Sequence, residues 1–561
     1  MTNKNNVQQY LQLENINHLN DFLCLLPQLS DYKNNDFRDT NRKLIHNVDR
    51  QEADDHSYAR SHIRTEVNSL SNADANSYSK SIAIGIDNSG KITTGGGNDI
   101  IFGVANADAS SEAKAIALAK SLFNCASTAD ANSQSIARSL ALATGINNLG
   151  RIATGGGNDI IFGVANADAS SEAKAIALAK LFSDNTSAAD ANSESIAEAI
   201  AGGAGIVNSG TIATGRGSDV IVGIANISTS TQALARAKAI VKANGFDNMS
   251  DLIDAQSTSN AIANAQTQAF GIYNSGKIFS GHGSDLILGL ANTENSSNTE
   301  AFAKTNAISD IATATAEGAA NAGISGNAIG IVNSGKINTG KGYDTIIGLA
   351  INNSLATANA DAKAISTGND NDSKSNTSSL SDTSAAIAIG IDNSSGKICT
   401  GKGNDLIIGN ASTIGILGGE IKTGSGRDRI IGKGGSVGIL DSKIYTGAGD
   451  DYLQAVKIEI DPVTRDSIVS EDQTGAISNT EVYGHGGHDV FEIGGFAGSV
   501  LINGGRDFDV LQLWGKIDDY QITLSSDCRT LTIEDSGSTL TAKNVEEFHF
   551  DNSQYSIKDF A

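Results

Sequence analysis

Aspartates recur along the chain at regular intervals, each within the same local phrase. The phrase is an Ile, an Asn-Ser-Gly-type turn, a second Ile, and then Thr/Ser-Gly-x-Gly-x-Asp-x-Ile/Leu. Its aspartates are Asp99, Asp159, Asp219, Asp285, Asp344 and Asp405, followed by Asp428 and Asp451. The intervals are 60, 60, 66, 59 and 61 residues, and then 23 residues for each of the last two. This periodicity predicts a solenoid in which equivalent residues of successive rungs stack in columns.

A column of stacked carboxylates has a defined electrostatic requirement. If the rungs are β-strands, neighbouring carboxylates lie about 4.8 Å apart. Two unit charges at that separation repel by roughly 3–4 kcal/mol at an effective dielectric constant near 20. A cation would relieve this repulsion, and calcium is the first hypothesis. The alternative is that each carboxylate only accepts N–H bonds of its own turn, as Asp commonly does.

The composition limits the class of protein. The chain has 561 residues, a formal charge of −23 and a pI near 4.7, and it is 39% hydrophobic but only 5% aromatic. We therefore expect no nucleic-acid partner, since phosphate binding needs clustered Lys and Arg. The two prolines, Pro27 and Pro462, lie outside the repeats, as long β-ladders require. No apolar run approaches the ~18 residues of a membrane span.

Neither the cysteines nor the N-terminus indicates a specific function. Cys24, Cys125, Cys399 and Cys528 are widely separated, show no metal-ligand spacing, and leave open whether they pair. The N-terminal sequence MTNKNNVQQY lacks the basic and then apolar profile of a cleaved signal peptide. We expect any export signal to lie elsewhere in the chain.

Between the aspartates, small residues alternate with larger ones. From Ala105 to Ser121, and again from Ala129 to Gly145, every second residue is Ala, Ser or Gly. This period of two predicts β-strands rather than helices. The 23-residue repeats show a minimal rung with a strand, a turn and a return strand. The longer rungs insert an out-and-back pair of strands. Ile101 shares the parity of the Ala/Ser positions, so these positions should face the interior of a thin, flattened solenoid.

An apolar stripe occupies the opposite parity beside the aspartates. Its members are Phe102, Phe162, Val222, Leu288, Ile347, Ile408 and Ile431. These residues should face outward, and a stripe of that length should not remain exposed. We expect the amphipathic segment around Tyr10–Leu29 to cover it. The alternative is a self-association surface.

Three nonapeptide-like segments carry a family resemblance. They are GGGNDII at residues 95–101, GKGNDLI at 401–407 and GAGDDYL at 447–453. They resemble RTX, or haemolysin-type, calcium-binding repeats. The resemblance implies a β-roll in which glycine turns present carbonyl oxygens and each Asp completes an oxygen cage for Ca²⁺. The metal-binding residues that it implies are Gly95, Gly97, Asp99, Gly155, Gly157, Asp159, Gly215, Gly217, Asp219, Gly281, Gly283, Asp285, Gly340, Gly342, Asp344, Gly401, Gly403, Asp405, Gly424, Gly426, Asp428, Gly447, Gly449 and Asp451.

The C-terminal region carries a second resemblance. Residues 504–511 (GGRDFDVL), 519–522 (DYQI) and 544–557 are similar to the tail of RTX proteins exported by type I secretion. This resemblance implies an uncleaved C-terminal signal, the type I secretion machinery as a partner, and an extracellular or cell-surface location.

The sequence also departs from the family pattern. Family β-rolls carry the nonapeptide on both edges, whereas most rungs here have one copy, so we expect a single column of aspartates. Thr or Ser replaces the first glycine in most copies, and His485 and Asp507 occupy glycine positions in two late copies.

Together these observations predict an all-β, parallel β-solenoid with wide Ala/Ser-lined rungs. The expected parts are a partly helical or disordered segment at residues 1–66, wide rungs at 67–399, short rungs at 400–455, irregular rungs at 456–511, and a C-terminal β cap with the secretion-signal region at 512–561. We expect a non-enzymatic, secreted, calcium-binding structural protein that folds on binding calcium. Two alternatives are an adhesin or self-assembling matrix protein, and a carbohydrate-active enzyme on a β-helix.

Overall fold

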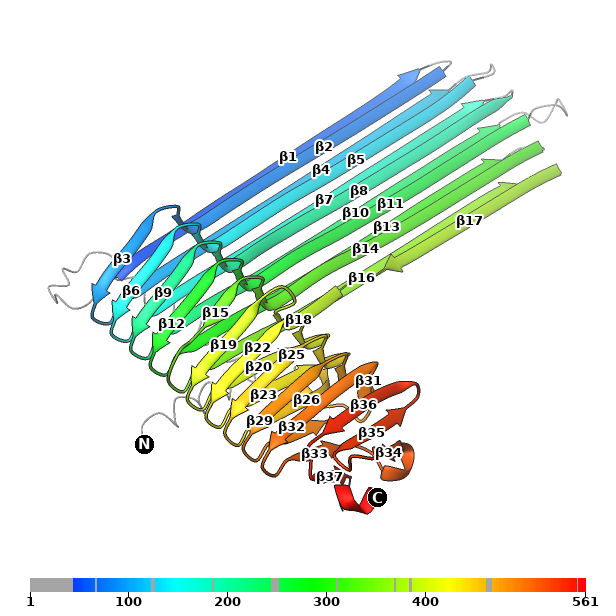
Figure 1. Ribbon diagram of the computed structural model, residues 1–561. Coiled ribbons are helices and arrows are strands. Elements are labelled where there is room, and N and C mark those ends of the chain that lie inside the picture. The colour runs from blue at the N-terminus through cyan, green and yellow to red at the C-terminus, as the bar shows by residue number, and fades with distance from the viewer. Residues whose placement is uncertain are drawn as a thin grey trace.

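The computed structural model is a parallel β-solenoid with a long lateral extension (Figure 1). It describes residues 44–65, 68–122, 127–183, 186–243, 252–308, 311–367, 370–382, 386–460, 467–551 and 553–561. The chain passes through three sheets in turn, and each pass through all three makes one rung. The prediction of an all-β parallel solenoid is confirmed.

Three sheets, here called A, B and C, build the rungs. Sheet A contains β1 (Leu44–Thr65), β4 (Ile100–Leu122), β7 (Ile160–Ser183), β10 (Val220–Ala243), β13 (Leu286–Ile308), β16 (Thr345–Thr367), β20 (Leu406–Ala411), β23 (Arg429–Gly434), β26 (Tyr452–Ile460), β30 (Val490–Ile493), β33 (Val510–Leu513), β37 (Glu547–Phe550) and β38 (Ser553–Ser556), with β27 (Ser467–Val469) paired to β26. Sheet B contains β2 (Asn68–Asn88), β5 (Ser127–Asn148), β8 (Ser187–Asn208), β11 (Leu252–Asn274), β14 (Ile311–Asn333), β18 (Ala386–Asp392), β21 (Ile414–Leu417), β24 (Val437–Leu440), β28 (Ile477–Ser478) and β31 (Phe496–Ala497), with β17 (Asp370–Asp382) paired to β14. Sheet C contains β3 (Lys91–Gly96), β6 (Arg151–Gly156), β9 (Thr211–Arg216), β12 (Lys277–His282), β15 (Lys336–Asn338), β19 (Lys397–Lys402), β22 (Glu420–Ser425), β25 (Lys443–Ala448), β29 (Glu481–Gly486), β32 (Ser499–Arg506), β36 (Ser538–Lys543), β35 (Thr530–Asp535) and β34 (Gln521–Leu524).

Sheet C corrects the expected two-strand rung. The 23-residue rung contains three strands, such as β20, β21 and β22, rather than one strand and its return. Sheet C strands are short, and each buries no more than two side chains, such as Ile152 and Thr154 in β6. So short a segment shows no recognisable period of two in the sequence.

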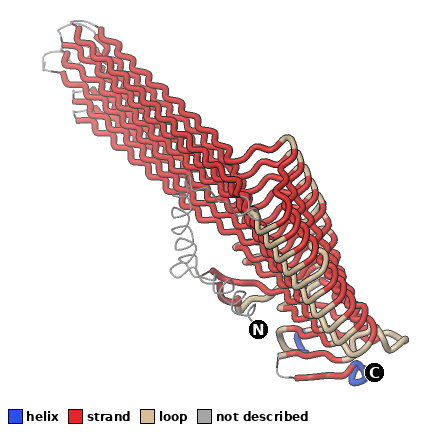
Figure 2. Tube along the Cα trace, turned by 90° about the vertical axis from the view of Figure 1, so that its left-hand side faces the viewer, coloured by secondary structure: helices blue, strands red, loops and turns tan. Residues whose placement is uncertain are grey.

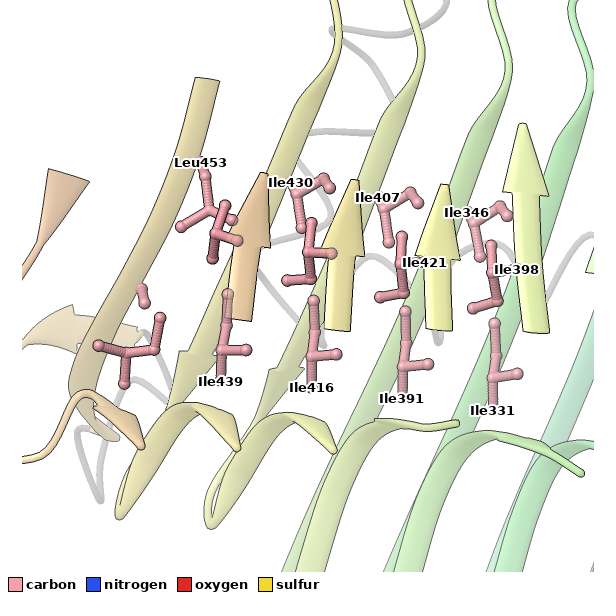
Figure 3. Packing of buried hydrophobic residues seen from close by; sticks show 14 of the residues in the cluster. Ile331, Ile346, Ile391, Ile398, Ile407, Ile416, Ile421, Ile430, Ile439 and Leu453 are labelled. Carbon is pink, nitrogen blue, oxygen red and sulfur yellow. The ribbon is translucent and has the colours of Figure 1, made fainter. Parts of the chain in front are cut away.

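Three columns of isoleucine form the core of the solenoid body. Ile346, Ile331 and Ile398 come from sheets A, B and C, and each is fully buried. Figure 3 shows these columns continuing through Ile407, Ile391 and the next rungs toward Leu453. Each rung therefore places one large apolar residue from every sheet at the centre. Parallel pairing without slippage keeps these residues in line.

The long strands of sheets A and B leave the body together as a two-layered wing (Figure 2). Ala113, Ala115 and Ala117 of β4 face inward and are 0% exposed, and Glu112 just before them faces outward. Ser133 of β5 bridges the layers, since its Oγ donates to Ala115 O at 2.9 Å and accepts from Ile176 N at 2.9 Å. The predicted Ala/Ser interior is confirmed. Such small side chains let the layers lie close together.

Glycines line the neck where the body narrows into the wing. A Cβ on Gly103 would lie 2.3 Å from Gly145 O, and a Cβ on Gly145 would lie 2.3 Å from Val164 N. Any larger residue would push the two sheets apart at this level. The neck thus depends on paired glycines in sheets A and B.

Some predicted features differ from the structure or lie outside its described part. Residues 44–65, assigned from the sequence to the N-terminal segment, form β1, because they pair in register with β4. In the apolar stripe, Phe102 and Phe162 are buried and stack with their ring centroids 5.3 Å apart. The segment around Tyr10–Leu29, expected to cover the stripe, lies outside the described residues. Of the cysteines, Cys399 and Cys528 are free.

The C-terminal end is closed by a different arrangement. β34, β35 and β36 are antiparallel, as are β37 and β38, and two short 3₁₀ helices, η1 (Ile517–Asp519) and η2 (Ile557–Phe560), accompany them. Phe548 and Phe550 are buried there, and Phe548 packs edge-on against Phe560 at 5.7 Å. These aromatic side chains cap the end of the isoleucine columns. Within the described residues, no helix has the length and apolar character needed to cross a bilayer.

The close packing of the wing gives a testable prediction. Ala173→Leu adds volume between the two layers at a fully buried position and should destabilise the fold by about 1–3 kcal/mol. The neighbouring control Glu172→Leu adds a leucine on the exposed outer face and should change stability by no more than about 0.5 kcal/mol. Urea unfolding followed by circular dichroism measures both. Equal destabilisation by the two variants would contradict the assignment of the interior face.

Candidate functional site

The predicted aspartates lie in one column at the corner where sheet C leads into sheet A. Each Asp stands immediately before a strand of sheet A, as Asp159 does before β7, and each is almost fully buried. The backbone N–H of Asp99 donates to Oδ1 of Asp159 at 2.8 Å, and the same bond links Asp159 to Asp219 at 2.9 Å. Each carboxylate therefore binds the backbone of the preceding rung.

This carboxylate ladder continues beyond the residues predicted from the sequence. The Asp451 N–H donates to Asp489, and the Asp489 N–H donates to Asp509, both at 2.9 Å. Asp509 N–H then donates to Glu546 Oε2 at 2.9 Å, which ends the ladder in the cap. Asp489 and Asp509 were not predicted from the sequence, because His485 and Asp507 obscure the glycine motif, and Glu546 follows no such motif. His485 and Asp507 nevertheless adopt positive φ, 74° and 78°, at the glycine positions.

The glycines of the motif are required by the close stacking of the corners. Gly155 has φ +107°, and a Cβ there would lie 1.8 Å from Gly95 O. Gly157 has φ +126°, and its Cβ would lie 2.0 Å from Gly97 O. All the predicted motif glycines share a positive φ. A side chain at either position would meet both backbone strain and the turn of the adjacent rung.

A further set of bonds runs along the outer side of the same corner. The backbone N–H of Asn158 donates to Asn98 Oδ1 at 2.8 Å, and that of Ser218 donates to Asn158 Oδ1 at 2.8 Å. These bonds run from a later rung to an earlier one, opposite to those of the aspartates. The corner is therefore held in both directions along the stack.

The second carboxylate oxygen, Oδ2, lacks a comparable partner. Thr339 Oγ1 donates to Asp344 Oδ2 at 2.7 Å, but Thr214 Oγ1 directs its proton to Ser280 O at 2.9 Å. Within the described part of the chain, a buried Oδ2 without a hydrogen bond occurs in Asp159, Asp219, Asp285, Asp405, Asp428, Asp451, Asp489 and Asp509. A column of buried, unsatisfied anionic oxygens is costly unless a proton or a cation compensates it.

Burial shifts the proton affinity of these groups. Desolvation, together with the charges of Asp285 and Asp405, raises the pKa of Asp344 to about 7, although the Thr339 hydroxyl opposes the shift. Desolvation likewise raises the pKa of Asp219 to about 6, although the hydrogen bond from the Asp159 backbone N–H opposes the shift. The pKa values of Asp451 and Asp489 rise to about 7 for the same first reason. Burial therefore disfavours the charged form of these carboxyl groups, and no nearby positive charge among the described residues compensates it.

The donor set fits a cation in part. Carboxylate oxygens suit Ca²⁺, which takes six to eight oxygen ligands. Some glycine carbonyls are already engaged, since Lys341 N–H donates to Gly281 O and Lys402 N–H donates to Gly340 O, both at 3.1 Å. The ladder is a single file, and the described residues hold no cluster of three or more His, Cys, Asp or Glu side chains suited to a metal ion. The Oδ2 atoms of consecutive rungs are the oxygens that would hold the ion.

Comparison with known proteins does not assign the chain to a family. No family model matches the sequence, and no curated protein matches it either.

The stacking of the corners predicts unequal effects at two adjacent glycines. Gly155→Ala should destabilise the protein by more than about 1 kcal/mol, because the residue has positive φ and its Cβ would meet Gly95 O. Gly156→Ala is the matched control, since the nearest atom to its Cβ is 4.0 Å away, and we expect a change within about 0.5 kcal/mol. Urea midpoints compare the two. A Gly155→Ala variant as stable as Gly156→Ala would refute this account of the turn.

The raised pKa values predict a pH dependence of stability. After removal of divalent cations, the folded chain binds more protons than the unfolded chain between about pH 4, the ordinary Asp value, and about pH 7, the value of Asp344. The free energy of unfolding should therefore fall as pH rises through this window. Urea unfolding at several pH values measures the slope. Asp344→Asn should reduce it, and exposed Asp361→Asn should leave it unchanged. A slope that Asp344→Asn leaves intact would contradict the prediction.

Proposed function

We propose that this chain is a secreted structural protein whose solenoid is stabilised by calcium along the carboxylate ladder. The observation that carries the proposal is the column of buried Oδ2 atoms without hydrogen-bond partners. The residues that would hold calcium are the ladder aspartates from Asp159 onward. Calcium would supply the positive charge that the fold does not provide.

The proposal includes a folding switch. Where calcium is scarce, the buried negative charges oppose stacking of the rungs. A ligand bound only by the folded state stabilises it by RT ln(1 + [L]/Kd). Extracellular calcium modules have Kd values of about 10⁻⁴–10⁻³ M. At a calcium concentration tenfold above Kd, each site would contribute about 1.4 kcal/mol. Several sites in one column would together favour the folded state outside the cell.

Export through a type I secretion system is the second part of the proposal. It is supported by the resemblance of the C-terminal region to RTX tails. That region is the cap that contains β33, β37 and η2. The extracellular or surface location follows from the same resemblance and from the calcium switch.

A non-catalytic role is the third part of the proposal. The described rungs repeat the ladder aspartates and the core isoleucines in the same columns, and a structural role needs no departure from this repetition. An active site would instead need acid and base side chains that differ from rung to rung. The ladder acids are equivalent to one another and face the interior.

A calcium titration tests the proposal. We expect the protein at pH 8 to bind calcium by calorimetry and to gain unfolding free energy in millimolar calcium. Asp405→Asn keeps an oxygen for the Asp344 N–H, which now donates to Oδ1 at 2.9 Å, but removes the buried charge. In EDTA this variant should be at least as stable as the wild type, and in calcium it should gain less, by about 1 kcal/mol.

Asp361→Asn is the matched control, because Asp361 is exposed on β16 and outside the ladder. It should follow the wild type in both conditions. The absence of calcium binding by calorimetry, or an equal calcium response in Asp405→Asn and the wild type, would refute the proposal.

A further inference from the structure

The outer face of sheet C is basic, although the chain as a whole is strongly acidic. In the first six rungs, the segments that form this face and its two corners contain no Asp or Glu before the ladder aspartate. They are residues 88–98, 148–158, 208–218, 274–284, 333–343 and 393–404. Their cationic residues are Lys91, Arg151, Arg216, Lys277, Lys336, Lys341, Lys397 and Lys402, and His282 accompanies them.

The register of the sheet arranges these side chains in two columns. The first column begins each strand, and Lys277, Lys336 and Lys397 are direct neighbours in it. The second lies at the strand ends, where Arg216 neighbours His282, and His282 neighbours Lys341. Successive side chains within a column are about 4.8 Å apart, and the columns are about 16 Å apart along the strands. Figure 1 shows the strands that carry them, β3 to β19, as one continuous row.

Apart from Lys397, the cationic side chains of this face form no ion pair with an acidic side chain within the described residues. Lys277 and Lys341 are exposed, and neither forms an ion pair within the described residues. Acidic side chains enter the first column only in the short rungs. There Lys397 pairs with Glu420 at 3.1 Å, and Lys443 pairs with Glu481 at 2.9 Å. The wide rungs therefore present positive charge that is balanced only where the short rungs begin, at Lys397.

The surface between the two columns restricts the kind of anion that fits. Thr93, Ala153, Ala213 and Asn338 point outward there, and Phe279 is the one aromatic side chain among the outward residues of these six strands. Single-stranded nucleic acids need repeated aromatic platforms for base stacking. Membrane surfaces need an apolar face to insert. A lane of mostly small side chains between two rows of cations suits a linear polymer of acidic sugars, whose carboxylates or sulfates pair with Lys and Arg.

We propose that the outer face of sheet C, from β3 to β19, binds a linear acidic polysaccharide that lies along the solenoid axis. This inference does not rest on the calcium proposal, since the two columns lie outside the core and the ladder lies inside it. The acidic polysaccharide would be the molecule to which the outer face of sheet C attaches the protein.

Binding of a fluorescent hyaluronan oligosaccharide by fluorescence anisotropy tests the proposal on the full-length chain. We expect binding that weakens when salt rises from about 50 to about 200 mM, and no binding of a neutral dextran of equal length. The charge reversal Lys277→Glu/Lys336→Glu/Lys341→Glu should weaken hyaluronan binding about tenfold or more. Circular dichroism verifies that each variant retains its strand content, so that loss of folding is not scored as loss of binding.

A second triple variant controls for net charge. Lys238, Lys304 and Lys363 stack in register on the outer face of the wing, beside acidic residues such as Glu300 and Asp361. The variant Lys238→Glu/Lys304→Glu/Lys363→Glu should bind hyaluronan within about twofold of the wild type. Equal weakening by both triple variants, equal binding of dextran, or tighter binding of a single-stranded DNA or of phosphatidylserine vesicles would each overturn the proposal. Loss of calcium binding alone would leave it intact.

Discussion

The hydrogen bond between the backbone of one ladder aspartate and the carboxylate of the next joins local turn geometry to the stacking of the whole solenoid. It forms only if every corner lies directly above its neighbour, because Asp159 must reach the N–H of Asp99. The same alignment places Ile152 over Ile212 in the core and Ala173 beside Ala233 in the wing. In this arrangement the second carboxylate oxygen, Oδ2, is buried in most ladder aspartates without a hydrogen-bond donor. The fold therefore requires a proton or a cation at these oxygens.

The core of the body and the interior of the wing are filled by side chains of different size. In the body, one isoleucine per sheet fills the space between three sheets. In the wing, only two layers face one another, and alanine and serine fill the narrower gap. The transition occurs at Gly103 and Gly145, where the backbones of the two sheets lie too close for a side chain. A change in side-chain volume along the strand therefore sets the change in cross-section from three layers to two.

Much of this architecture follows from periods in the sequence, and the parts that do not have identifiable causes. The alternation from Ala105 to Ser121 predicts long strands with a small interior, and the burial of Ala113 and Ala117 confirms it. Sheet C was not predicted, because its strands bury too few residues to show a period.

The missed site residues have similar causes. Asp489 and Asp509 escaped detection because non-glycine residues take the left-handed positions at His485 and Asp507. The net charge of −23 gives no sign of the basic face of sheet C. Its Lys and Arg residues lie about sixty residues apart in the sequence, and only the strand register brings them together. Regular spacing in the sequence thus predicts columns of identical residues, such as the ladder aspartates. It does not predict columns whose residues share only their charge, such as those on the outer face of sheet C.

The near identity of neighbouring rungs has a consequence for how such a chain can change. Residues 100–120 and 160–180 are the same, letter for letter, and pair along their whole length. Because these two rungs present the same residues to their neighbours, an in-frame gain or loss of one sixty-residue unit here would keep the pairing register on both sides. Recombination between such repeats could then add or remove whole rungs of the wing, which makes the length of the wing along the stack a heritable, adjustable trait.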